Sequence, residues 1–476
     1  MAFKILSATF LQDGKHSFTL DFSKPENESQ DSQFTLLIGK NGVGKSLILE
    51  AIIDFLFYVW VSNTMYSMVR RNKYIFCTTL VYSMNGATCK LDWKDGCLHS
   101  YIDEEECSFS LEMLPRIVAT SFSICDKFKV PRSNEREQYH FYKYIGAKVN
   151  GNMISPTSIL FTLLSNIASA SKEQLSRINN AVNAIGYELC ISFRFKLQAV
   201  NDKLSFNKAL NTIEMKAKET TYAGKKFRQL NFDEKHVLFD FYERIKENKD
   251  TISMNIDLID DNDLETKKHD VYALYKFRQM GIVNLSQISF RKVSKDYVSC
   301  IDMSSGEFNM LATIISVASV AEQNVLVLMD EPEISQHPSW QMSIIDYLDK
   351  CLKGQSCHLI IATHSNFLVS DLPMKRSEVL HLYKDEENLI ESKRIESNTY
   401  GWSAEEVLLK VFEVSTTRNR YLAGIVGELM NGISNDTLKM EDVQNKVSFL
   451  KEIVGNLNDI DPMKKIIETI IETFEE

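Results

Sequence analysis

Gly39-Lys40-Asn41-Gly42-Val43-Gly44-Lys45-Ser46 is the stretch that decides the fold. It follows an apolar run at residues 34–38, which is typical of a buried strand, and it precedes residues 47–57, which predict a helix. The glycines let the backbone curl until several N–H groups point at a phosphate chain, and the helix N-terminus adds its positive dipole end. We therefore expect a P-loop, with Lys45 on the β- and γ-phosphates and the Ser46 hydroxyl on Mg²⁺.

Length, charge and cysteine content limit the class of protein. The chain has 476 residues, room for more than one structural unit, and an ordinary 25% of charged residues. Its net charge of −10 argues against nucleic-acid binding over the whole surface but not against a local basic patch. Nine cysteines without a C-x-x-C pair argue against a disulfide framework or a zinc site. Neither a signal sequence nor a membrane-spanning run is evident, so we expect a cytoplasmic protein without membrane contact.

Turn signals predict antiparallel strands on both sides of the P-loop. Residues 3–9 and 17–22 alternate apolar and polar side chains around Asp13-Gly14, and we expect them to form edge strands. Beyond the P-loop helix, two hairpin signals, Asn85-Gly86 and Asp95-Gly96, separate strand-like runs at residues 74–82, 87–93 and 97–101. An antiparallel layer therefore follows the nucleotide-binding strand.

The rest of the chain changes character twice. The patterns at residues 156–186 and 207–280 are mainly helical, with a strand at 188–195, and no apolar heptad persists long enough for a coiled-coil arm. Strand character returns between residues 290 and 395, and the tail is helical throughout. We expect the first part of a nucleotide-binding head, a mainly helical insertion, the second part of the head and a helical C-terminal region, at residues 1–150, 151–285, 286–398 and 399–476.

A second candidate strand carries the acidic half of the site. The apolar run at residues 324–329 leads into Asp330 and Glu331, and such a strand brings carboxylates to the sheet edge where nucleotides bind. Asp330 is predicted to hold Mg²⁺, and Glu331 to act as the base that polarises the attacking water. Asp330 lies 284 residues after Ser46, so we infer that an insertion splits one ATP site.

Met303-Ser304-Ser305-Gly306-Glu307 opens a helix just before that strand. Serine hydroxyls and free N–H groups at a helix start form an anion site, although the same residues also suit a plain helix cap. In this order of motifs the chain resembles ABC-class ATPases, in the form found in the RecF, OLD and SMC branch. The resemblance implies an α/β head, with a mixed sheet flanked by helices, in which Ser304, Ser305, Gly306 and Glu307 reach the γ-phosphate held by a second subunit.

Other parts of the resemblance concern nucleotide sensing. Thr363-His364-Ser365 after the next strand matches the family's switch histidine, His364. Ser335-Gln336-His337-Pro338 matches the loop that crosses the dimer interface. The family's Mg²⁺-sensing glutamine should lie between Arg116 and Pro131, where no glutamine occurs, so Ser121 or Asp126 is the expected substitute.

Three stretches outside the ATP motifs resemble PtuA-like ATPases of Septu and retron-associated antiphage systems. They are residues 119–128 (ATSFSICDKF), 142–148 (YKYIGAK) and 399–408 (TYGWSAEEVL), and Glu331-Pro332-Glu333 with His337-Pro338 also fits. The resemblance implies a homodimer or higher oligomer that holds a separate HNH nuclease and regulates it while hydrolysing ATP slowly. DNA or RNA, including retron reverse transcriptase and msDNA, are further partners that it suggests.

Several alternatives stay open from the sequence. The chain could instead be a RecF- or SMC-like DNA-repair ATPase that clamps DNA, or cleave DNA itself through Asp459 and Asp461, which sit between helical segments. The apolar stripe of Val407, Leu408, Val411 and Phe412 is either core or a partner surface. Two basic clusters are either phosphate contacts or solvated faces: Lys127, Lys129, Arg132 and Arg136, and Lys216, Lys218, Lys225, Lys226 and Arg228.

Overall fold

The computed structural model divides the chain into two compact units, Met1–Ala404 and Glu405–Glu476. No helix among the described residues is long and apolar enough to span a membrane. The structure describes residues 3–22, 31–62, 74–121, 123, 127–130, 141–146, 148, 156–197, 230–248, 250–280, 282–320, 323–395, 399–412, 420–435, 440–455 and 462–474.

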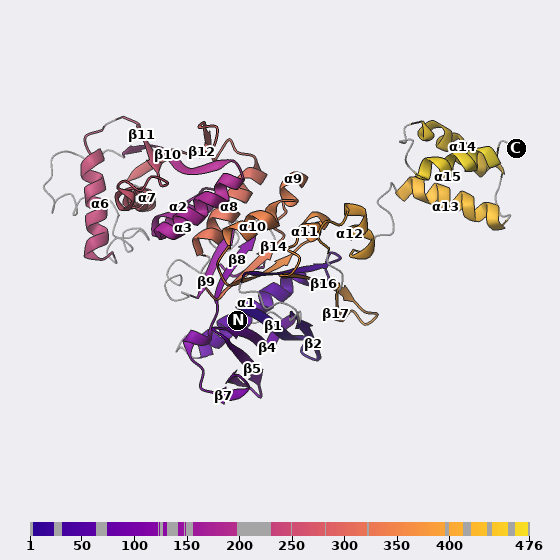
Figure 1. Ribbon diagram of the computed structural model, residues 1–476, viewed down its shortest axis with the longest axis horizontal. Helices are drawn as coiled ribbons and strands as arrows, with labels where there is room; N and C mark the ends of the chain where they lie inside the picture. The colour runs from indigo at the N-terminus through magenta and orange to yellow at the C-terminus, as the bar shows by residue number, and fades with distance from the viewer. Residues whose placement is uncertain are drawn as a thin grey trace. The chain divides into compact units, whose positions relative to one another are not determined.

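A seven-stranded sheet forms the centre of the first unit (Figure 1). Within this sheet, neighbouring strands are parallel, except for the pair β16 and β17 at one edge, which is antiparallel. Strands β3, β14 and β15 are buried along their whole length, as expected for parallel strands covered on both faces. The spatial order is β17 (Ile390–Arg394), β16 (Ser377–Lys384), β3 (Gln33–Gly39), β15 (Cys357–Ala362), β14 (Val325–Asp330), β8 (Arg116–Ser121) and β9 (Tyr142–Gly146).

A six-stranded antiparallel sheet carries the predicted hairpins. Asn85 and Gly86 have φ angles of 54° and 86°, and Asp95 and Gly96 have 52° and 80°, which suits the tight turns predicted there. Strand β1 lies inside this sheet, so the prediction of an edge strand is wrong for it and right for β2. The order is β2 (His16–Asp21), β1 (Lys4–Gln12), β4 (Ile75–Met84), β5 (Ala87–Lys94), β6 (Cys97–Ile102) and β7 (Glu105–Cys107).

Helix α1 (Lys45–Ser62) lies between these two sheets (Figure 1). It is apolar nearly all round, and residues such as Ile48, Ile52 and Leu56 belong to one core shared with both sheets. A helix that is hydrophobic on every side is stable only when it is covered on every side. The P-loop that precedes α1 is therefore anchored between two rigid layers.

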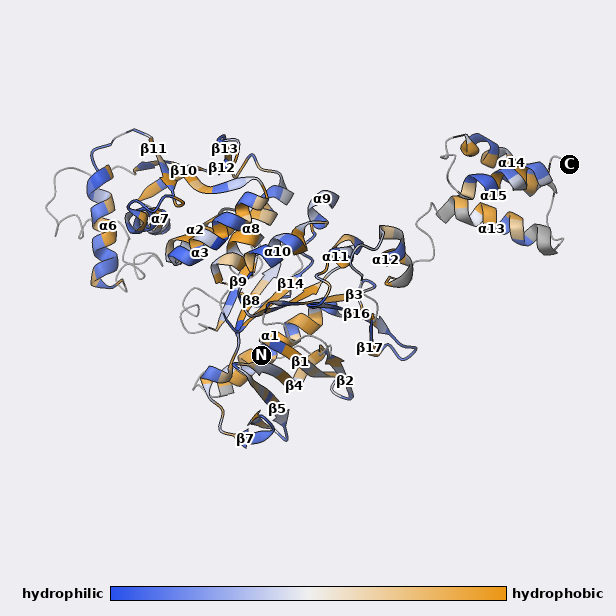
Figure 2. Cartoon of the chain, in the orientation of Figure 1, coloured by the Kyte–Doolittle hydropathy of each residue, from blue (hydrophilic) through white to orange (hydrophobic). Residues whose placement is uncertain are grey.

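Helices and a third sheet cover the other face of the central sheet. Helices α2 (Pro156–Ser169), α3 (Lys172–Ala184), α8 (Ser305–Val320) and α10 (Ile344–Cys351) pack together there. Beyond them lies the four-stranded antiparallel sheet of β11 (Ile252–Asp257), β10 (Tyr187–Leu197), β12 (Val283–Lys292) and β13 (Tyr297–Ser299). Helices α6 (Phe232–Ile245) and α7 (Leu264–Gln279) accompany it, and α6 is mostly hydrophilic in Figure 2.

The sheet in this region differs from the mainly helical pattern that the sequence predicts. Strand β11 lies within residues 207–280, which we expected to be helical, and it pairs with β10. Most of its side chains are exposed or half-buried, and Ile256 is the one buried residue of this strand. Pairing with a distant strand therefore outweighs the local helical pattern here.

The smaller segments and the second unit complete the structure. Short elements are η1 (Leu111–Met113), α9 (Pro338–Gln341), α11 (Asn366–Ser370) and α12 (Ala404–Lys410). The helical tail is confirmed: α13 (Arg420–Asn435), α14 (Met440–Val454) and α15 (Pro462–Thr473) share an apolar core that includes Leu429, Leu450 and Ile467.

The apolar stripe predicted in the tail lies on and just after α12. Val407 and Val411 are buried, and Leu408 and Phe412 are half-buried, which favours a core role over a partner surface. Asp459 and Asp461 lie outside the described residues.

Candidate functional site

The P-loop adopts a backbone shape that depends on glycine. Gly39 and Gly44 have φ angles of 150° and 115°, which residues with a side chain rarely adopt. A Cβ atom on Gly39 would lie 2.3 Å from the carbonyl oxygen of Leu382 on β16. The loop thus curves tightly at the carboxyl end of β3, as a P-loop requires, and phosphate binding by residues 39–46 stays a prediction.

Lys45 is held across this loop. Its Nζ donates to the Gly39 carbonyl at 3.0 Å and lies 2.7 Å from Nε2 of His364. Burial lowers the pKa of Lys45 to about 8, while the charges of Glu331 and Asp330 oppose that shift. The ammonium group is therefore still mostly charged at neutral pH and loses its charge above pH 8. Its contact with the β- and γ-phosphates stays a prediction.

Ser46 and Asp330 meet, as the sequence predicts for one split site. The Ser46 hydroxyl donates to Oδ1 of Asp330 at 2.7 Å, and Asp330 is buried at the end of β14. A hydroxyl and a carboxylate are the hard oxygen ligands that Mg²⁺ prefers, so this pair fits the metal. The described residues contain no group of three or more His, Cys, Asp or Glu side chains that could hold a metal by themselves.

Glu331 and His364 lie beside the lysine. Glu331 has a φ of 48° and donates its N–H to the Ala362 carbonyl at 2.8 Å, so the chain turns sharply where β14 ends. Its Oε1 lies 3.6 Å from Nε2 of His364. Burial and the nearby Lys45 lower the pKa of His364, and Glu331 only partly opposes them. A neutral imidazole can accept a hydrogen bond from the lysine.

Glu333 belongs to the same cluster, although the sequence motif assigned it no role. Its Oε1 accepts hydrogen bonds from the Thr363 hydroxyl at 2.7 Å and from the His364 N–H at 2.8 Å. The signal available in the sequence was a second acid two residues after Glu331, together with a Thr-His pair at the end of the next strand. Spacing alone could not show that these two segments touch.

The signature turn has a different set of contacts. Ser304 caps helix α8: its hydroxyl accepts the Glu307 N–H at 3.2 Å, and Glu307 accepts the Ser304 N–H at 3.1 Å. The helix cap that the sequence allowed is thus observed, and the role of these residues in anion binding stays a prediction. Gly306 packs closely on the loop at residues 335–336. A Cβ atom on Gly306 would lie 2.6 Å from the backbone carbonyl oxygen of Ser335. Ser305 is exposed.

The proposed substitutes for the sensing glutamine are only partly described. Ser121 is buried at the carboxyl end of β8, in register with Asp330 on the neighbouring strand. Its hydroxyl accepts the Ser123 N–H at 3.2 Å. Asp126 lies outside the described residues, so the choice between the two stays a prediction.

Most of the two basic clusters also lies outside the described residues. Lys129 is engaged with α1, at 3.4 Å from Asp54 and above the ring of Phe57. Lys127 is exposed. The residues not described are Arg132, Arg136, Lys216, Lys218, Lys225, Lys226 and Arg228. Lys129 therefore has a structural role, whatever its neighbours contact.

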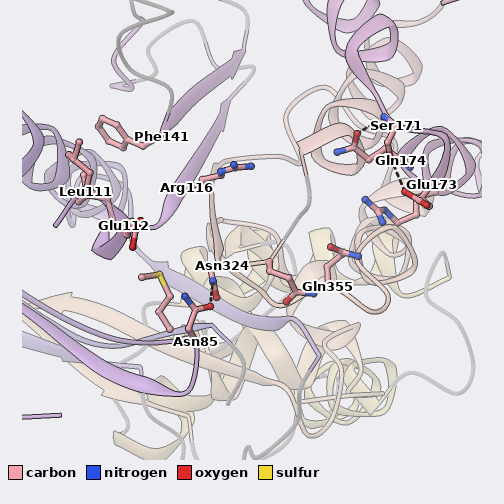
Figure 3. A pocket seen from close by; sticks show the side chains of 14 residues that line it. Asn85, Leu111, Glu112, Arg116, Phe141, Ser171, Glu173, Gln174, Asn324 and Gln355 are labelled. Carbon is pink, nitrogen blue, oxygen red and sulfur yellow. Dashed lines mark hydrogen bonds between the residues drawn. The ribbon is translucent and has the colours of Figure 1, made fainter. Parts of the chain in front are cut away.

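A separate cavity of about 870 Å³ lies at the opposite edge of the central sheet (Figure 3). Its lining includes Arg116 at the start of β8, Asn324 just before β14 and Gln355 just before β15. The Asn324 amide donates to Oδ1 of Asn85 at 2.6 Å. Since the P-loop lies at the carboxyl ends of the same strands, this cavity is distinct from the phosphate cradle.

Residues 99–369 match the family model described as an AAA ATPase domain. The chain belongs to this family. The matched region contains Asp330, Glu331, His364 and the signature turn, while the P-loop precedes it in the chain. Membership implies that the chain binds ATP and Mg²⁺ and hydrolyses ATP. The contacts of Lys45 and Ser46 with His364 and Asp330 agree with this activity.

This AAA ATPase also has distant relatives among curated proteins. It is 22% identical to the Retron Ec83 probable ATPase of Escherichia coli over 93% of this chain and 82% of the relative. It is 24% identical to the Septu protein PtuA of Bacillus thuringiensis over 40% of this chain and 47% of the relative. Protein ea59 of Escherichia phage lambda is 29% identical over 25% of this chain and 22% of the relative. The match thus spans less than half of two of these proteins, and the predicted relation to antiphage ATPases is confirmed as a distant one.

Solved structures of SMC head domains are similar to this AAA ATPase. The SMC head domain from Thermotoga maritima has 11% identity and a TM-score of 0.38, covering 83% of this chain and all of that one. An SMC head bound to the C-winged helix domain of ScpA has 14% identity and a TM-score of 0.35, covering 82% and 98%. The mixed α/β fold predicted from the sequence is evident in the order of the central sheet itself.

Proposed function

We propose that this chain is the ATP-binding, slowly hydrolysing ATPase subunit of an antiphage defence complex. Two heads would form two composite sites, each with the P-loop of one subunit and Ser305-Gly306 of the other. The ATP-dependent dimer would regulate a separate HNH nuclease.

One observation carries the proposal: the site residues in this chain fall into two groups that make separate contacts. His364 lies 2.7 Å from Lys45 and 3.6 Å from Glu331. Ser46, next to Lys45 in the chain, donates to Asp330, next to Glu331. The contacts of the signature turn instead go to the loop at 335–336 and to Tyr187 and Lys292. A second copy of the chain would bring an exposed Ser305 to the open side of the P-loop.

The chain's own residues would divide the work of hydrolysis. Bound Mg²⁺ would supply positive charge against the phosphates and would be held by Ser46 and Asp330. Lys45 would bind phosphate oxygens, and Glu331 would orient a water molecule and accept its proton. His364, neutral and beside Glu331, would contact the terminal phosphate through its ring.

A trapping experiment tests the dimer. We expect Glu331→Gln to bind ATP, hydrolyse it at least about 100-fold more slowly and accumulate as a dimer, measured by size-exclusion chromatography with light scattering. Lys45→Ala should show no ATP-dependent change in mass. If Glu331→Gln has the same mass with and without ATP, while Lys45→Ala binds ATP normally, the composite site is wrong.

Purification from cells that carry the neighbouring genes tests the partner. The distant similarity to PtuA and to the retron ATPase leads us to expect a small HNH nuclease to copurify with a tagged chain, identified by mass spectrometry. ATPase activity of the pure chain that rises several-fold with DNA, without a copurifying nuclease, would instead support a DNA-repair clamp. Metal-dependent nicking by the pure chain, lost when Asp459 and Asp461 are replaced, would assign cleavage to this chain.

A further inference from the structure

We propose that Glu333 is a positioning residue that holds the His364 segment in place for ATP hydrolysis. The inference rests on the ATP site of the proposed function but assigns a role to a side chain outside its motifs. Glu333 contacts neither the P-loop nor Ser46 through any hydrogen bond among the described residues. Its action is through the backbone that carries the histidine.

One carboxylate oxygen organises three consecutive residues. Oε1 of Glu333 accepts both the Thr363 hydroxyl at 2.7 Å and the His364 N–H at 2.8 Å. The same Thr363 hydroxyl oxygen accepts the Ser365 N–H at 2.9 Å. Three hydrogen bonds thus define the turn that follows β15, and each depends directly or indirectly on Glu333.

The second carboxylate oxygen makes this arrangement energetically costly. Oε2 is inaccessible to solvent and has no hydrogen-bond partner among the described residues. Burial also raises the pKa of Glu333, and the hydrogen bonds from Thr363 and His364 only partly offset that effect. A carboxylate oxygen that is buried without a hydrogen bond destabilises a fold, so stability alone does not account for an acid here.

The ring of His364 depends on this turn for its location. Its Nε2 lies between Nζ of Lys45, at 2.7 Å, and Oε1 of Glu331, at 3.6 Å. A shift of the His364 backbone by a fraction of an ångström would change both distances. Groups that orient a functional side chain in this way affect activity about 10- to 100-fold in metal sites, and we expect a similar range here.

A double-mutant cycle on ATP hydrolysis tests the proposal, using Glu333→Ala, His364→Ala and the double variant. We expect Glu333→Ala to lower kcat about 10- to 100-fold while ATP affinity changes less than about threefold. In the His364→Ala background the same substitution should lower kcat less than about twofold, because the ring it positions is gone. Independent, multiplicative losses would overturn the proposal.

Conservative variants separate position from charge and from folding. Glu333→Gln keeps an oxygen acceptor for Thr363 and His364, and should recover kcat to within about threefold of wild type. A glutamine variant as impaired as the alanine variant would overturn positioning in favour of a need for charge. If Glu333→Ala does not fold, Thr363→Val, which removes one of the two donors, is carried through the same cycle with the same criteria.

Two controls distinguish this inference from the proposed function. Asp371→Asn removes another half-buried carboxylate, at the end of α11, and should leave kcat unchanged. Lys45→Ala tests the ATP site itself. If Lys45→Ala hydrolyses ATP normally, the proposed function fails whatever the cycle shows; if Lys45→Ala is inactive and the cycle is additive, only the role of Glu333 fails.

Discussion

Two short turns rich in glycine or serine open helices in this protein, and they differ in what they contact. Where the P-loop runs into α1, Lys45 reaches His364, just after β15, and Ser46 reaches Asp330, at the end of β14. In the signature turn ahead of α8, Ser304 and Glu307 bond to each other and leave Ser305 exposed. The first turn is integrated into its own chain's site, whereas the second is complete as a cap and has an exposed hydroxyl available for another molecule.

The largest expected effect concerns the P-loop side of this comparison. Lys45→Ala should abolish measurable ATP hydrolysis, a loss of about 100-fold or more, because it removes the ammonium group that reaches both the Gly39 carbonyl and His364. A coupled phosphate-release assay measures the loss. Thermal melting provides the control, since an unchanged melting temperature shows that the loss of hydrolysis does not come from loss of the fold. Hydrolysis at the wild-type rate would place the nucleotide elsewhere.

Mixing two inactive variants tests whether the turns act in different subunits. Ser305→Arg should block the signature turn while leaving ATP binding intact, and Lys45→Ala should do the reverse. In a mixed dimer one composite site combines the intact halves, so an equal mixture should recover about a quarter of wild-type hydrolysis if the subunits exchange freely. Each variant alone is the control, and a mixture as inactive as its components would show that the two turns do not complement each other.

The pH dependence of ATP binding should come from the P-loop side alone. Without bound nucleotide, burial lowers the pKa of Lys45 from 10.5 to about 8. The side chain therefore loses its charge above pH 8 in the folded protein. Phosphate favours the charged form, so ATP affinity should fall by up to about tenfold per pH unit above pH 8, with proton uptake on binding. Calorimetry at pH 8.5 in buffers of different ionisation enthalpy measures that uptake.

The same shift predicts the sign of a stability effect. Between pH 8 and 10.5 the unfolded chain binds more protons at Lys45 than the folded chain, so the penalty for burying this group is full below pH 8 and declines as pH rises. Lys45→Arg stays charged throughout, and its ATP affinity should show no such decline. An equal decline in Lys45→Arg would assign the titration to another group.

The smallest expected effect distinguishes the two serines of the signature turn. Ser304→Ala removes the cap of α8 and should lower the free energy of unfolding by about 1 kcal/mol, measured by urea denaturation. Ser305→Ala should leave stability unchanged, because Ser305 is exposed and its hydroxyl has no hydrogen bond among the described residues. If Ser305→Ala is the more destabilising, the assignment of cap and exposed hydroxyl is reversed.

Local chemistry explains which parts of the fold could be predicted. The turns at Asn85-Gly86 and Asp95-Gly96 require positive φ angles, and few residue pairs supply them, so these hairpins follow directly from the sequence. Strand β1 could not be placed inside its sheet, because its second neighbour, β4, follows α1 in the chain and only tertiary packing brings them together. The short strand β11 is similar: pairing with β10 determines it.

The site divides in the same way. Ser46 beside Asp330 was predictable, since parallel strands bring their carboxyl ends to one edge and the two motifs end such strands. The contact of Lys45 with His364 and the bonds of Glu333 were not, because they depend on side-chain directions in a turn with a positive φ at Glu331. Sequence patterns therefore predict which strands and helices lie together, but they do not predict the individual hydrogen bonds between side chains.

The position of β3 in the central sheet has a consequence for synthesis of the chain. Its two neighbours, β15 and β16, lie more than three hundred residues later, and Gly39 packs directly on the Leu382 carbonyl of β16. While the ribosome is still making the insertion, β3 has both edges unpaired and its apolar faces only partly covered. A nascent chain therefore carries the P-loop long before the strands that flank β3 are made, and during that interval its unpaired apolar strand is prone to aggregation.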